Sequence, residues 1–183
     1  METYYLWQII LVGVLVAVTI YYAVQTYRQA NLLKEQIEEN RKRYEEERRI
    51  RAAERVLSWA EESFDVLARP TRYKDLSQQK VDLIIRLQPS HVKSYSILHF
   101  VEKLGGELNT KTKTAYICFS KFIATLGTEE DITRLKEYFW ATDFGEAKPI
   151  NNGEELKEAK KELMLYLGEV INSAADFLLI TPL

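Results

Sequence analysis

Few side chains in this sequence are suited to bind a metal or to act as an acid or base. His91 and His99 are the only two histidines. His99 and Glu102 stand three residues apart, and such a pair on one helix face occurs in carboxylate-bridged metal sites of helical bundles. Those sites draw matching sets from several helices, and the sequence offers no second set. We therefore expect partly exposed surface histidines, with no metal site and no cofactor.

Cys118 is the only cysteine, so the chain cannot form an internal disulfide, which suits a reducing compartment. It lies in an apolar stretch with no basic cluster beside it to lower the thiol pKa. This position predicts a buried structural thiol.

Arg86 and His91 form an Arg-x-x-x-x-His pattern. The pattern resembles the motif of the HEPN ribonuclease families, which are helical domains that use such a pair on RNA. The resemblance covers two residues and implies that Arg86 and His91 are catalytic. Leu87 stands where those families often carry a polar residue. Pro89 lies between the pair, so we expect Arg86 and His91 on two different structural elements.

Four aromatic residues fall within seven positions near the C-terminal third of the chain. Four such side chains cannot all face one side of a helix, so we expect one or two of them to be exposed. Exposed aromatic side chains are common anchors at protein interfaces. The cluster consists of Tyr138, Phe139, Trp140 and Phe144, and it predicts a partner-binding site at Tyr138, Trp140 and Phe144.

The element that positions everything else is the apolar run of residues 6–24, which has no charged residue. A helix crosses a bilayer core with about 20 apolar residues, so this run predicts a membrane anchor. The core ends in Tyr21-Tyr22 rather than in a small-residue cleavage pattern, so we expect no removal as a signal peptide. Residues expected at the membrane interface are the flanking Tyr4, Tyr5, Trp7, Tyr21, Tyr22, Tyr27 and Arg28.

No basic residue precedes the run, whereas five follow it closely: Arg28, Lys34, Arg41, Lys42 and Arg43. This asymmetry predicts the N-terminus outside and the C-terminal head in the cytoplasm. Gly13 and Ala17 form a small-xxx-small pair that can bring two membrane helices together.

Residues 28–51 are rich in Glu, Arg, Lys and Gln and contain no Gly or Pro, which predicts a charged helical stalk that continues the membrane helix. Opposite charges recur at helical spacing, for example Glu45 and Arg49. Leu33 and Tyr44 belong to a heptad seam that fails after about two heptads, so a solvated helix is favoured over a dimeric coiled coil.

Residues 52–183 predict an all-α head of five or six helices, with the end of the stalk helix as its first member. The apolar seam of that member runs through Ala53, Leu57, Ala60 and Phe64, and Trp59 flanks it. Breaks are predicted at Pro70, at Pro89, at Gly105-Gly106, at Gly127 and over residues 142–153. The last helix, residues 154–179, is apolar nearly all round at its end, so we expect it in the bundle centre.

Charge excludes one class of function for the head. Residues 56–183 carry 16 Lys and Arg against 19 Asp and Glu, so no basic field for nucleic-acid binding is present. We expect a membrane-anchored interaction, scaffolding or regulatory module, with the lipid bilayer and an unidentified protein as partners. Self-association through the stalk or through Gly13 and Ala17 is open. The alternative is a membrane-tethered HEPN-like ribonuclease or toxin-type effector that uses Arg86 and His91.

Overall fold

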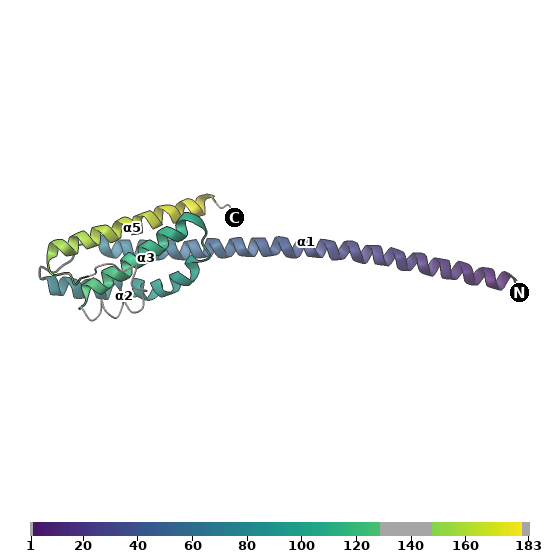
Figure 1. Cartoon of the computed structure of the whole chain (residues 1–183), viewed down its shortest axis with the longest axis horizontal. Coiled ribbons are helices and arrows are strands. Elements are labelled where there is room, and N and C mark those ends of the chain that lie inside the picture. The colour runs from purple at the N-terminus through teal and green to yellow at the C-terminus, as the bar shows by residue number, and fades with distance from the viewer. Residues whose placement is uncertain (1, 129–147, 181–183) are drawn as a thin grey trace. The chain divides into compact units, whose positions relative to one another are not determined.

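The computed structural model describes residues 2–128 and 148–180, except for the side chains of residues 2–6 and Leu98. The described secondary structure is entirely helical, which confirms the all-α prediction. Its helices are α1 (Glu2–Ala68), α2 (Leu76–Val101), α3 (Gly106–Leu126) and α5 (Gly153–Ile180) (Figure 1). The chain divides into two compact units, residues 1–47 and 48–183.

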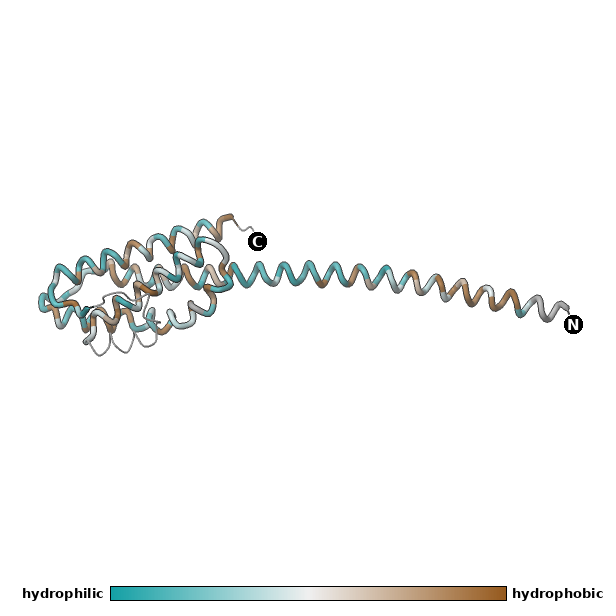
Figure 2. Tube along the Cα trace, in the orientation of Figure 1, coloured by the Kyte–Doolittle hydropathy of each residue, from teal (hydrophilic) through white to brown (hydrophobic). Residues whose placement is uncertain are grey.

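The described part of the first unit is the N-terminal part of α1, up to Glu47. Figure 2 shows its hydrophobic N-terminal part giving way to a hydrophilic one along the same helix. Within the apolar part, the Thr19 hydroxyl donates to the carbonyl of Leu15 at 2.8 Å, so this polar group is satisfied inside the helix. In the charged part, Glu45 Oε1 lies 3.8 Å from Arg41 Nε. Arg41 is one turn before Glu45, whereas Arg49, the partner that spacing alone suggested, is one turn after it.

Of the helices that the structure describes, α1 and α5 are long and apolar enough to cross a membrane. They differ in burial: no residue of the apolar window of α1 is buried, whereas 22% of the α5 window is. The buried stripe of α5 packs into the core of the second unit and comprises Leu156, Leu163, Leu167, Val170 and Ala174.

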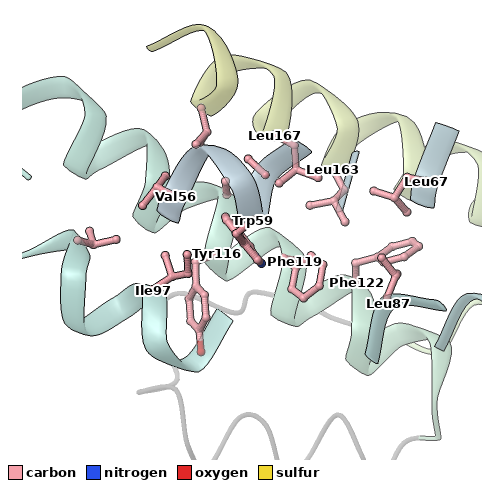
Figure 3. Packing of buried hydrophobic residues seen from close by; sticks show 14 of the residues in the cluster. Val56, Trp59, Leu67, Leu87, Ile97, Tyr116, Phe119, Phe122, Leu163 and Leu167 are labelled. Atoms are coloured by element: carbon pink, nitrogen blue, oxygen red, sulfur yellow. The ribbon is translucent and has the colours of Figure 1, made fainter. Parts of the chain in front are cut away.

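The second unit is built around Trp59, whose side chain is only 1% exposed. Its ring meets Phe119 of α3 edge-on, with centroids 5.5 Å apart and planes at 73°. Leucines from α2 and α5 complete the layer, as Figure 3 shows for Leu87 and Leu167. Ala53 and Ala60 of the predicted seam are buried, whereas Leu57 and Phe64 are only partly buried. Trp59, which spacing placed beside the seam, is itself buried, together with Val56 and Ser63.

α2 continues through Pro89, so the prediction that this proline ends a helix is wrong. The reason lies in the buried stripe of α2, which keeps 3–4 spacing across the proline: Leu83, Leu87, Ser90, Ser94, Ile97 and Val101. A proline in a helix interior costs about 3 kcal/mol relative to alanine. Burial of the residues on both sides offsets that cost. The indole N–H of Trp59 also donates to the carbonyl of Ser90 at 3.2 Å, directly after the proline.

Local signals set the other helix ends. Asp75 caps α2 by accepting from the backbone N–H of Gln78 at 3.1 Å. α3 begins at Gly106, the second glycine of the predicted break, because the φ of 65° at Gly106 turns the chain sharply after α2. Asn152 caps α5 by accepting from the N–H of Glu155 at 2.9 Å, and Glu155 reaches back to the N–H of Asn151 at 2.7 Å.

Candidate functional site

α2 carries a second apolar stripe, on the side opposite its buried one. We call it the α2 outer stripe and define it as Val81, Ile84, Ile85, Val92 and Tyr95, which are 38–63% exposed. Together with the exposed Gln88 between them, residues 81, 85, 92 and 95 follow the same 3–4 spacing as the buried stripe, displaced by two positions, which is about 200° around a helix. A single helix thus presents one apolar face to the core and another to solvent.

A hollow lies at the N-terminal end of the α2 outer stripe. It has a volume of about 370 Å³, and its described lining includes Tyr73, Val81 and Ile85. Tyr73 stands in the loop before α2 and is 45% exposed. An apolar stripe that ends in a hollow beside an aromatic side chain suits the insertion of an apolar anchor from a partner.

Tyr95, at the other end of the stripe, is held in place. Its Oη lies 3.1 Å from Nε2 of His91, and the two rings meet edge-on with centroids 5.0 Å apart. The ring of His91 also stacks on Phe119, with centroids 6.3 Å apart and planes at 29°. This contact chain connects the exposed Tyr95 to the core.

Arg86 and His91 lie on one helix, α2, so the expectation of two separate elements is wrong. Five residues correspond to about 500° of helix rotation, which leaves the two side chains about 140° apart. Arg86 Nε donates to Asp82 Oδ1 at 3.0 Å, and Arg86 Nη2 lies 2.8 Å from Asp82 Oδ2. The two residues of the ribonuclease-like pattern therefore contact different surroundings: Asp82 for the arginine, and Tyr95 and Phe119 for the histidine.

The surroundings of His91 disfavour the charged imidazolium. Burial lowers the pKa of the imidazole, and Nδ1 is buried without a hydrogen-bond partner among the described residues. His99 is exposed and lies against the ring of Phe100, with centroids 5.9 Å apart. Within residues 2–128 and 148–180, no group of three His, Cys, Asp or Glu side chains is placed to hold a metal ion.

Cys118 is a partly buried free thiol on α3. Burial, with a smaller contribution from the charge of Glu162, raises the pKa of the thiol to about 11. A thiol with so high a pKa is protonated at neutral pH and is a poor nucleophile. Its surroundings match a structural role.

The remaining residues singled out from the sequence fall into two groups. Tyr138, Trp140 and Phe144 lie outside the described residues. Among the expected membrane-interface residues, the side chains of Tyr4 and Tyr5 also lie outside the described set. The others are exposed on α1: Trp7, Tyr21, Tyr22, Tyr27 and Arg28.

Comparison with protein-family models, with curated proteins and with solved structures finds no match to this chain.

Sequence reasoning missed the α2 outer stripe because it treated all the apolar residues of this segment as core. The signal was present in the spacing, since two sets of apolar residues alternate within residues 76–101. With the helix divided at Pro89, each half was too short to show two separate stripes. Recognising one continuous helix reveals both.

Proposed function

We propose that this protein is a single-pass membrane-anchored adaptor whose helical head binds an amphipathic helix of a protein partner through the α2 outer stripe. In this proposal residues 6–24 cross the bilayer, residues 28–51 form a charged helical stalk, and the head is a five- or six-helix bundle. The N-terminus lies outside, and the head works at the cytoplasmic face. Scaffolding or regulation at the membrane is the resulting role.

One observation carries the proposal: the α2 outer stripe leaves four large apolar side chains more than half exposed at heptad-like spacing. Spacing of this kind matches the side-chain rows of a second helix, as in helix-in-groove recognition. Contiguous exposed apolar patches on soluble domains commonly mark interaction sites.

The charges around the stripe are largely neutralised within the head. Arg86 pairs with Asp82, and Lys93 Nζ lies 2.6 Å from Glu62 Oε2 of α1. A surface so neutralised favours a partner helix with an apolar face over a strongly charged peptide.

Site-specific photocrosslinking of the full chain in its native membrane tests this site. A photoreactive residue at Ile85 or at Val92 should give the same adduct, whereas the exposed Lys113 of α3 is the control position and should give none. The double substitution Ile85→Glu and Val92→Glu should abolish the adduct obtained from a reporter at Tyr73. An adduct that forms equally from Lys113, or that survives the double substitution, rejects the site. An adduct of twice the chain mass identifies a second copy as the partner.

The aromatic cluster is a separate proposed contribution to partner binding. Replacing Trp140 and Phe144 with Ser should weaken capture of the crosslinked partner while helicity at 222 nm is retained. Undiminished capture would remove the cluster from the interface.

Membrane topology has its own test. A reporter that is active only in the cytoplasm, fused after Leu183, should be active, and an inactive fusion refutes the inside assignment of the head.

No observation among the described residues favours a second function. Arg86 is engaged by Asp82, and His91 lies against Phe119. His91→Ala separates the adaptor from the ribonuclease alternative: a folded head with an unchanged cellular phenotype counts against RNA cleavage. Loss of an RNA-dependent phenotype would count against the adaptor.

A further inference from the structure

A cavity of about 550 Å³ opens in the second unit where the end of α1, the start of α2 and the start of α5 meet. This volume falls within the roughly 300–1,000 Å³ range of sites that bind small molecules. The cavity is distinct from the α2 outer stripe, because none of the five residues of that stripe lines it.

The charge lining this cavity has one sign. Lys157, Lys160 and Lys161 of α5 line it, and none of its described lining residues is acidic. Among the described residues, no ion pair or hydrogen bond engages any of these three lysines. Glu154 and Glu158 stand one turn before Lys157 and Lys161, but neither forms an ion pair with these lysines among the described residues. Both oxygens of Glu155 accept from the Asn151 and Asn152 cap.

The lysines are also mutually close by helix geometry. Lys157 and Lys161 are four residues apart, and Lys157 and Lys160 are three apart, so all three project from neighbouring positions of one face. Like charges at this spacing destabilise a helix. Burial and the charge of Arg86 both lower the pKa of Lys160, which is half-buried at the cavity wall. An anion in the cavity would relieve this repulsion.

The floor of the cavity is apolar. Leu67 and Leu156 are buried core residues, and Met164 packs against the core beside them. A ligand that fills this space therefore needs an anionic group near the lysines and an apolar body against the floor. Lysine binds phosphate as a compact point charge.

We propose that this cavity binds a phosphate monoester that carries an apolar group. The chemistry is shared by soluble phosphate esters and by the phosphatidic acid headgroup of the bilayer. Lys157, Lys160 and Lys161 bind the phosphate, and Leu67, Leu156 and Met164 contact the apolar group. The head thereby gains a small-molecule input separate from its protein-binding stripe.

Lysine footprinting tests this site directly. The full chain is placed in phosphatidylcholine nanodiscs and acetylated briefly with or without 1-naphthyl phosphate, and modification at each lysine is read by mass spectrometry. The probe should protect Lys157, Lys160 and Lys161, whereas the exposed Lys42 and Lys113 should acetylate unchanged. Neutral 1-naphthol should protect none of them, and inorganic phosphate should protect more weakly than the ester. A second arm uses nanodiscs that contain phosphatidic acid and no soluble probe, so that the arm showing protection identifies the source.

Matched variants complete the test. Lys157→Gln with Lys161→Gln should weaken protection of Lys160 by at least about tenfold in probe concentration, because two charge-assisted contacts are lost. The control Lys42→Gln with Lys113→Gln removes the same charge and should leave protection unchanged. The site is rejected if neither arm protects the three lysines, or if Lys42 and Lys113 are protected equally. Because footprinting of the unsubstituted chain already decides between these outcomes, a variant that fails to fold does not remove the test.

Discussion

Replacing Pro89 with alanine should stabilise the second unit. Pro89 is exposed and lies inside α2, where it lacks the N–H that would otherwise donate to the carbonyl of Ile85. Alanine restores that donor and removes the ring that crowds the preceding turn. If the chain instead formed two helices separated at this proline, the same substitution would remove a useful stop signal and destabilise the unit.

The magnitude follows from opposing terms. The full difference between proline and alanine in a helix interior is about 3 kcal/mol. A more flexible unfolded chain takes back about 0.4–1 kcal/mol, and a helix with an interior proline generally adjusts its backbone there, which relieves part of the steric cost. We expect a net gain of about 1–2 kcal/mol in the free energy of unfolding, which raises Tm by about 3–8 °C for a unit of this size.

Thermal unfolding of the full chain in detergent micelles, followed by circular dichroism at 222 nm, measures this gain. Gln88→Ala is the matched control, because Gln88 is exposed next to the proline and has nearly the same helix propensity as alanine. Hydrogen exchange supplies a second readout, since the new amide at position 89 should be protected by the Ile85 carbonyl. A lower Tm for Pro89→Ala, or a freely exchanging amide there, would refute the continuous helix.

Three further outcomes follow from the core. Trp59→Phe leaves the buried Ser90 carbonyl without its indole donor. It should lower the free energy of unfolding by about 2–4 kcal/mol, measured in urea at unchanged m value. A decrease below about 0.5 kcal/mol contradicts the contact. Because the Cys118 pKa is raised to about 11 from an ordinary 9.0, its alkylation by iodoacetamide at pH 7.5 should be about 100-fold slower than in the urea-unfolded chain, and equal rates would show an accessible thiolate. The pKa of His91 is lower in the folded chain than in the unfolded chain, so as pH falls the unfolded chain takes up a proton at a higher pH than the folded chain does. The contribution of this group to stability is therefore complete above pH about 6.5 and is lost as pH falls below it. His91→Gln should therefore flatten the loss of stability between pH 7 and pH 5, and an unchanged slope would show that His91 is not the group responsible.

The helical class and several boundaries were predictable because local signals decide them. The end of α3 at Leu126 follows from Gly127, and α5 begins and ends within one residue of its predicted range. These signals act over three or four residues, so the sequence contains them completely. The break placed at Pro89 was wrong because a local steric cost was weighed without the packing on both sides of it.

The site was less predictable than the fold. The ribonuclease-like pattern brought Arg86 and His91 together on spacing, but helix rotation separates their side chains, and each has other partners. The lysines that line the cavity looked like ordinary charges of a solvated helix. Only the approach of Leu67 from α1 and Gln79 from α2 makes a hollow beside them.

By itself, the sequence determined that residues 6–24 are apolar enough to cross a bilayer, that a charged helix follows, and that the secondary structure of the other described residues is helical. Composition and periodicity carry this information because the hydrogen bonds within a helix and its contact with solvent depend on the residues of that helix alone. Tertiary structure alone decided which of the two apolar stripes of α2 is buried. The inner stripe holds four aliphatic residues beside Ser90 and Ser94, and the outer one holds four beside Tyr95, so the number of aliphatic side chains does not decide between the two faces. Trp59 and Phe119 select it, because their rings supply the surface against which that face packs.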